Sequence, residues 1–140
     1  MIKGIYGVNI AVRDLSDATQ KYETFFGVRG RSLGPDSFAF PGLRGTQIDV
    51  AGFRINLIAS DEPGTSVASF LEKRGEGLFL LSVEVDDIES DVSRLREMGA
   101  TILMNENAEG EFGAVNFVHP KSMAGVQVEI YAPSSDYKAE

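Results

Sequence analysis

Apolar side chains alternate with small or polar ones in two distant segments of the chain. Residues 7–15 read GVNIAVRDL, and residues 80–88 read LLSVEVDDI. A period of two is typical of a β-strand with one buried face. The pattern therefore predicts strands over residues 7–12 and 80–85.

The two segments also match each other. Placing residue 7 on residue 80 gives an offset of 73, and the same offset carries residues 54–59 (RINLIA) onto residues 127–132 (QVEIYA). In the first pair of segments, Val8, Ile10 and Val12 fall on Leu81, Val83 and Val85. In the second pair, polar falls on polar at the first and third positions, and apolar on apolar at the second and fourth. Any two amphipathic strands look somewhat alike, but two separate matches at one offset indicate a duplicated unit.

An acidic residue and an amphipathic helix follow each alternating strand. Asp14 and Asp87 are placed to cap the helices, because their carboxylates can accept from free backbone N–H groups. Apolar residues recur at helical spacing on one side of each helix. They are Ala18, Tyr22, Phe25 and Phe26 in the first helix, which ends near Gly27, and Ile88, Val92, Leu95 and Met98 in the second, which ends at Gly99-Ala100.

Short strand-like runs with glycine turns complete each unit. They lie at 45–50 and 53–59, then at 101–104, 115–118 and 126–131. We predict one domain over residues 1–140, with units at about 4–60 and 77–133. Residues 61–76 form a linker with a short helix around Val67, Phe70 and Leu71, and residues 134–140 a frayed tail.

Composition excludes several classes of protein. The 140 residues include no cysteine and one histidine, so disulfides, thiolate sites and mechanisms that need two histidines are ruled out. The net charge of -8 disfavours nucleic-acid binding. No window approaches a membrane span or a signal peptide, so the expected location is the cytoplasm, with no membrane partner.

Several runs resemble those of a known superfamily. GVNIAVRDL, SVASFLEKRGEG, SVEVDDIES, FVHPKS and GVQVEIYAP are similar to segments of the vicinal oxygen chelate superfamily, which includes glyoxalases, bleomycin-resistance proteins and dioxygenases. They look most like its methylmalonyl-CoA epimerase branch, although residues 29–44 are not matched. The resemblance implies an α+β fold with two tandem βαβββ units, a curled mixed sheet around a cleft, and a homodimer.

The resemblance also implies four metal-binding positions, usually His, Gln or Glu, His and Glu. The residues at these positions are Gly7, Asn56, Leu80 and Glu129. Glycine and leucine offer no side-chain ligand, and one amide with one carboxylate is a poor set for a divalent ion. We therefore expect no metal and no other cofactor.

Strand alternation and the resemblance together place a group of mostly polar residues in the cleft. The group comprises Gly7, Asn9, Arg54, Asn56, Leu80, Ser82, Gln127, Glu129 and Tyr131.

Each candidate has a catalytic and a structural interpretation. Glu129 is either a general base with a pKa raised by burial or a relic of the metal site. Tyr131 and Gln127 either orient a substrate carbonyl or pack at the rim. Arg54 either binds a substrate carboxylate or forms a surface ion pair.

Two further candidates lie in the turn before the last strand. His119 and Lys121 could supply charge to a CoA phosphate or carboxylate, or could simply belong to a turn stiffened by Pro120. Phe38 and Phe40 are either an apolar lid or ordinary core.

Three functions remain open from the sequence. The first is a metal-independent isomerase, epimerase or lyase that moves a proton next to a carbonyl of a small carboxylic or CoA-linked substrate, with Glu129 as base. The second is a protein that sequesters a small cationic or aromatic molecule, as the bleomycin-resistance branch does, which the negative charge would favour. A subunit with a vestigial cleft is a third possibility.

Overall fold

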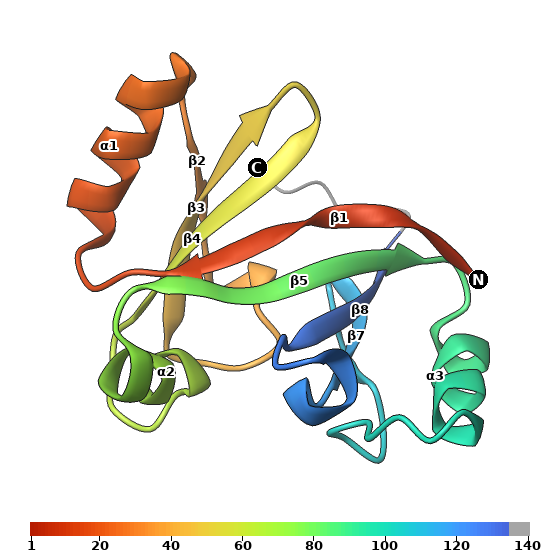
Figure 1. Cartoon of the computed structure of the whole chain (residues 1–140). Coiled ribbons are helices and arrows are strands. Elements are labelled where there is room, and N and C mark those ends of the chain that lie inside the picture. The colour runs from red at the N-terminus through yellow and green to blue at the C-terminus, as the bar shows by residue number, and fades with distance from the viewer. Residues whose placement is uncertain (135–140) are drawn as a thin grey trace. The chain divides into compact units, whose positions relative to one another are not determined.

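The computed structural model describes residues 1–134; the predicted tail beyond Ser134 lies outside the described residues. Eight strands and three α-helices occur in this part of the chain (Figure 1). In chain order they are β1 (Ile2–Ala11), α1 (Leu15–Phe26), β2 (Arg31–Leu33), β3 (Leu43–Val50), β4 (Phe53–Ser60), α2 (Ser66–Arg74), β5 (Gly77–Val85), α3 (Ile88–Glu97), β6 (Ala108–Gly110), β7 (Gly113–Val118) and β8 (Val128–Pro133). Two short 3-10 helices lie at Pro35–Ser37 and Pro120–Met123.

The chain forms two compact units. One consists of Gly7–Phe79, and the other joins Met1–Tyr6 to the described residues from Leu80 to Ser134. The first six residues thus belong to the unit that is otherwise built from the second half of the sequence. In the described part of the chain, no helix has the length and hydropathy needed to cross a membrane.

In the unit Gly7–Phe79, the sheet has the strand order β2-β3-β4-β1, with β1 contributing residues 7–11. β1 runs parallel to β4, and the other two pairs are antiparallel. Helix α1 packs on one face, where Ala18 joins a cluster with Ile48 and Leu57. Helix α2 contributes Val67 and Leu71 to the cluster on the other face, so each face has its own core.

The predicted helix caps are confirmed. The Asp14 carboxylate accepts from the Asp17 backbone N–H at the start of α1, and Asp87 accepts from Ser90 at the start of α3. Helix α1 ends at Gly27, whose left-handed backbone (φ 68°) suits a residue without a side chain.

The predicted buried face of α1 is wrong at one position. Phe25 is 81% exposed, whereas the adjacent Phe26 packs on the core. Phe25 lies at the edge of the apolar stripe in the last turn of the helix. Its ring contacts Phe26 edge-on instead of reaching the sheet.

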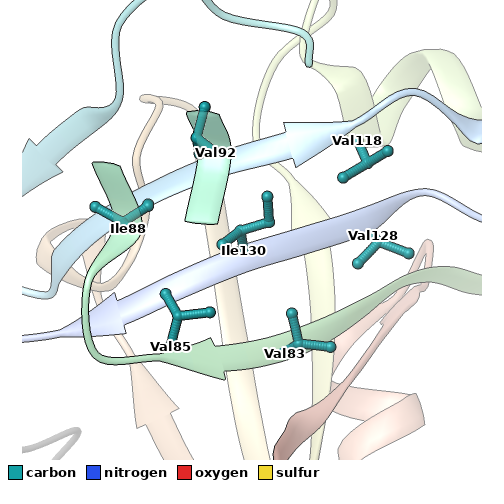
Figure 2. Packing of buried hydrophobic residues seen from close by; sticks show 7 residues of the cluster. All are labelled: Val83, Val85, Ile88, Val92, Val118, Val128 and Ile130. Carbon is teal, nitrogen blue, oxygen red and sulfur yellow. The ribbon is translucent and has the colours of Figure 1, made fainter. Parts of the chain in front are cut away.

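In the second unit, the strands run in the order β5-β8-β7-β6. Figure 2 shows the core that α3 forms with this sheet: Ile88 and Val92 face branched side chains of β5, β8 and β7. The strand residues are Val83, Val85, Val118, Val128 and Ile130. These side chains fix which face of the sheet α3 covers, and therefore which face is left for Glu129.

The internal repeat is confirmed in the register of the strands. In one unit Asn9 pairs with Asn56 across the parallel strands β1 and β4. In the other, Ser82 pairs with Glu129 across the parallel strands β5 and β8. Both members of the first pair map onto the second at the offset of 73. The order of elements also confirms the α+β fold of two βαβββ units.

Two details of the strand prediction are wrong. Residues 101–104 form no strand and make only an isolated bridge between Ile102 and Val118; the sixth strand lies later, at β6. The Asn116 side chain explains the difference, because it bonds both the N–H and the C=O of Met104 in place of a strand partner. The short strand β2 was not predicted.

The predicted apolar side of the second helix is wrong at Met98. This residue lies beyond the end of α3 and is 72% exposed.

A buried acidic residue ties the N-terminus to α3. Asp91 is 2% exposed and accepts from the Met1 α-amino group at 2.6 Å and from Arg94 at 3.1 Å. Burial raises the pKa of the Asp91 carboxyl, but the hydrogen bonds and charges of these two cations outweigh burial and lower it overall. The same contact raises the pKa of the α-amino group of Met1.

We therefore expect stability to fall at both ends of the pH range. The lowered pKa of Asp91 gives stability that is present above the carboxyl's unfolded pKa and is lost as pH falls through the folded value. The raised pKa of Met1 gives stability that is present below about pH 8 and is lost as pH rises further. Melting temperatures of wild type and Asp91→Asn between pH 3 and 10 test this expectation. The melting temperature of the variant should fall less than that of wild type at both low and high pH. Parallel curves of melting temperature against pH would contradict a stabilising contact between Met1 and Asp91.

Candidate functional site

A row of polar side chains crosses all four strands of the unit Gly7–Phe79. Its members are direct cross-strand partners: Arg31 on β2 pairs with Gln47 on β3, Gln47 with Asn56 on β4, and Asn56 with Asn9 on β1. Cross-strand partners project from the same face of a sheet. Register alone therefore aligns the four side chains, and we call them the polar row.

Hydrogen bonds connect the polar row from end to end. The Arg31 guanidinium donates to Gln47 Oε1 at 2.9 Å, Gln47 Nε2 donates to Asn56 Oδ1 at 3.1 Å, and Asn56 Nδ2 donates to Asn9 Oδ1 at 3.1 Å. Gln47 is 3% exposed, while Asn56 and Asn9 are half-buried. The row brings together two of the residues predicted for the site, Asn9 and Asn56.

The next row on the same face is apolar. It consists of Leu33, Gly45, Ile58 and Ala11, each the partner of the one before it. Helix α2 covers these residues, and Phe38 packs against the same cluster. Phe38 is therefore part of the core, whereas Phe40 is 47% exposed.

In the other unit, the equivalent row carries a carboxylate. Ser82 Oγ donates to Glu129 Oε1 at 2.7 Å, and Phe117 on β7 is the partner of Glu129 on its other side. Ser82 is 1% exposed and Glu129 is half-buried. Their side chains alternate with Val83, Val128 and Ile130, so they lie on the face opposite α3.

Burial raises the pKa of the Glu129 carboxyl, and the hydrogen bond from Ser82 lowers it by less. Among residues 1–134 the structure gives Glu129 no ion pair that would hold it in the charged form. A carboxyl with a raised pKa is a stronger base once ionised, which suits proton abstraction.

Tyr131 lies on the same face as Glu129 but is committed to structural contacts. It is 6% exposed, and its hydroxyl donates to the Phe112 backbone carbonyl at 2.8 Å. Its ring meets Tyr6 edge-on, with centroids 4.8 Å apart. Since the hydroxyl hydrogen already has an acceptor, orienting a substrate carbonyl, the role predicted for Tyr131, would require this hydrogen bond to break.

The remaining predicted site residues lie in various surroundings. His119 caps the 3-10 helix Pro120–Met123, and its Nδ1 accepts from the backbone N–H of Lys121, whose side chain is exposed. Gln127 precedes β8, is half-buried, and its backbone carbonyl accepts from Leu81. Arg54 is half-buried opposite Gly7 on β1 and Asp49 on β3.

The donors at the four expected metal positions do not fit a divalent ion. A side chain cannot even begin at Gly7, because a Cβ atom there would lie 2.2 Å from the Arg54 carbonyl oxygen. Leu80 is 4% exposed and has no donor atom. The Asn56 oxygen already accepts a hydrogen bond from Gln47. Glu129 is then the one carboxylate among the four positions. Among the described residues, no group of three or more His, Cys, Asp or Glu side chains could hold a metal.

Two members of the polar row, Arg31 and Gln47, were not predicted for the site. Gln47 is a polar residue inside an otherwise apolar strand, between Thr46 and Ile48, and that is the signal that could have identified it. Arg31 gives no comparable signal, because its strand has only three residues.

The fold agrees with comparisons to known proteins. The model of the Glyoxalase/Bleomycin resistance protein/Dioxygenase superfamily matches residues 7–118, and the chain belongs to this superfamily. A comparison with curated proteins gives no match.

Among solved structures, the chain is similar to methylmalonyl-CoA epimerase from Mycobacterium tuberculosis, with 31% identity, a TM-score of 0.81, and coverage of 95% of this chain and 89% of that one. It also resembles the Streptomyces coelicolor methylmalonyl-CoA epimerase in complex with 2-nitronate-propionyl-CoA, with 22% identity, a TM-score of 0.83, and coverage of 96% and 100%. The latter likeness shows the fold alone.

Proposed function

We propose that this protein is an epimerase-type enzyme that removes the proton next to the carbonyl of a CoA-linked carboxylic acid, with Glu129 as the general base. The observation that carries the proposal is the half-buried Glu129 carboxylate, whose pKa burial raises. Ser82 holds one of its oxygens at 2.7 Å, which orients the carboxylate within its row. An oriented base of raised pKa is what abstraction of a weakly acidic C–H proton requires.

The solved relatives support the substrate class. The Mycobacterium tuberculosis protein is a methylmalonyl-CoA epimerase, and another epimerase of the same fold was solved with methylmalonyl-CoA and NH4+. Such a substrate combines a carboxylate, a thioester carbonyl and an acidic C–H bond between them. We therefore choose methylmalonyl-CoA as the first compound to test.

We further propose that the reaction proceeds without a divalent metal in this site. The support is the donor set, because Gly7 and Leu80 provide no ligand and the Asn56 oxygen already accepts a hydrogen bond. Charge that develops on the substrate oxygen would then be stabilised by neutral hydrogen-bond donors.

Hydrogen–deuterium exchange tests both proposals together. Protein treated with a chelator is incubated with methylmalonyl-CoA in D₂O, and loss of the C2 proton signal is followed by NMR against a protein-free control, with metal content measured by elemental analysis. Exchange above the control at well below one metal per chain is expected. Exchange that requires stoichiometric metal would overturn metal independence.

Absence of exchange for methylmalonyl-CoA and for other acyl-CoA esters would overturn the enzyme proposal. Tight binding of a cationic ligand such as bleomycin, with no exchange, would favour the sequestering function instead. The net charge of -8 is the observation that keeps this second function under test.

A further inference from the structure

The polar row is a chain of hydrogen bonds in which every bond points the same way. Donation runs from Arg31 to Gln47, from Gln47 to Asn56 and from Asn56 to Asn9. Each amide in the row accepts on its oxygen from the side of Arg31. Each of the first two amides then donates from its nitrogen toward Asn9.

The cation at one end sets this direction. A guanidinium has only donors, so the Gln47 oxygen must face Arg31 and its NH₂ group must face Asn56. The Asn56 oxygen then has to face Gln47, which turns the Asn56 NH₂ group toward Asn9. The same rule turns the Asn9 oxygen toward Asn56 and its NH₂ group away from the row.

The NH₂ group of Asn9 therefore ends the chain as an open donor. Every fully buried side-chain nitrogen and oxygen among residues 1–134 has a hydrogen-bond partner. The structure gives the Asn9 amide nitrogen no partner among the described residues, and Asn9 is half-buried. Its NH₂ group is thus accessible to a ligand, while the hydrogen bond from Asn56 to the Asn9 oxygen fixes the orientation of the amide.

We propose that the polar row is a donor-terminated binding site, in which Asn9 binds an oxygen acceptor of the ligand and Arg31 and Gln47 are positioning residues that keep the donor facing it. The ligand chemistry is an electron-rich oxygen, either a carboxylate or a carbonyl. This proposal deepens the proposed function, because both groups occur in an acyl-CoA ester of a dicarboxylic acid.

The positive end of the row strengthens the donor at the other end. Hydrogen bonds in series polarise one another, and Arg31 contributes a full charge at the start. Asn9 itself remains neutral. Its NH₂ group therefore stabilises an oxygen as negative charge develops on it, without placing a full positive charge beside that oxygen. Such oriented donors are the usual means of stabilising an enolate or oxyanion.

Reversing the direction of the row tests the proposal. Arg31 is exposed on an edge strand, so its replacement should leave the unit folded. In Arg31→Glu the carboxylate has only acceptors, so each amide should turn over and the Asn9 oxygen should end the row. Arg31→Lys keeps a donor of the same charge and is the matched control.

The measurement is NMR of the side-chain NH₂ groups. In wild type and Arg31→Lys, the Asn9 NH₂ hydrogens should exchange with water faster than the bonded Asn56 hydrogen, by about tenfold for one lost hydrogen bond. In Arg31→Glu the Asn9 group becomes a donor within the row, so its exchange should slow by a similar factor. Equal Asn9 exchange in all three proteins would overturn the assigned direction.

Titration with sodium acetate tests the ligand class without any enzymatic readout. Acetate should shift the Asn9 NH₂ resonances of wild type and Arg31→Lys, and should shift those of Arg31→Glu much less. Equal shifts in all three, or none in wild type, would overturn the binding site. These outcomes do not depend on C2 exchange, so this proposal can fail while Glu129 remains the base, and the reverse.

Discussion

Glu129→Gln is expected to lower the rate of C2 proton exchange by about 10²–10⁴-fold, the usual contribution of a general base. Glutamine keeps the shape of the side chain and can still accept from Ser82, but it cannot take up the substrate proton. Binding of the acyl-CoA ester should change much less, which isothermal titration would show. The wild-type rate should also rise with pH as the Glu129 carboxyl, whose pKa is raised, becomes ionised.

Glu84→Gln is the matched control for this variant. Glu84 is half-buried two residues beyond Ser82 on β5, and its carboxylate lies 3.8 Å from the Lys3 ammonium group. It should keep nearly the wild-type rate. If Glu129→Gln turns over as fast as Glu84→Gln, Glu129 is not the base.

The stability of Glu129→Gln gives an independent check of the carboxyl's surroundings. A carboxyl whose pKa is raised in the folded state favours the protonated form there. The folded state therefore loses stability as pH rises from the carboxyl's pKa in the unfolded state toward its pKa in the folded state. Glutamine has no charge to lose, so the variant should melt at a higher temperature than wild type at pH 7 and nearly at the same temperature at pH 4. The opposite order would contradict a raised pKa.

Gly7→Ala is expected to destabilise the protein by roughly 1–3 kcal/mol, the usual cost of forcing an extra group into a packed site. The new Cβ atom would lie 2.2 Å from the Arg54 carbonyl oxygen and 2.9 Å from the Arg54 Cβ atom. Both obstacles belong to the neighbouring strand, so the two strands themselves would have to move apart. Urea denaturation measures the change.

Gly4→Ala provides the comparison within the same strand. A Cβ atom at Gly4 would meet nothing within 4 Å, so this variant should have nearly the stability of wild type. Equal stability of the two variants would contradict the close contact between a Cβ atom at position 7 and the Arg54 carbonyl oxygen. For the same reason, Gly7→His should not create a metal site, because the imidazole cannot be placed without separating β1 from β4.

Sequence periodicity was sufficient to predict the repeat and the strands that carry its polar residues. Alternation fixes the face on which a side chain lies, and one shared offset fixes the equivalence of Asn56 and Glu129. The helix caps were predicted because Asp14 and Asp87 act on backbone groups only three residues away. Local chemistry of this kind is readable from the sequence.

The remainder of the site depends on pairing between strands that no local pattern encodes. Gln47 joins the site through its antiparallel pairing with Asn56, and Arg31 through its pairing with Gln47. The strand that carries Arg31 has three residues, too few to show a period. A long-range contact likewise places Tyr131, whose hydroxyl is bonded by a carbonyl 19 residues earlier in the chain.

The boundaries between the two units have a consequence for synthesis. They fall within strands, between Tyr6 and Gly7 in β1 and between Phe79 and Leu80 in β5. Residues 1–6 therefore belong to a unit whose other strands are synthesised only after residue 79. Chains generally fold from the N-terminus as they are synthesised. Here Gly7–Phe79 can become compact first, while Met1–Tyr6 must wait for α3 and its Asp91 before the α-amino group finds its ion-pair partner.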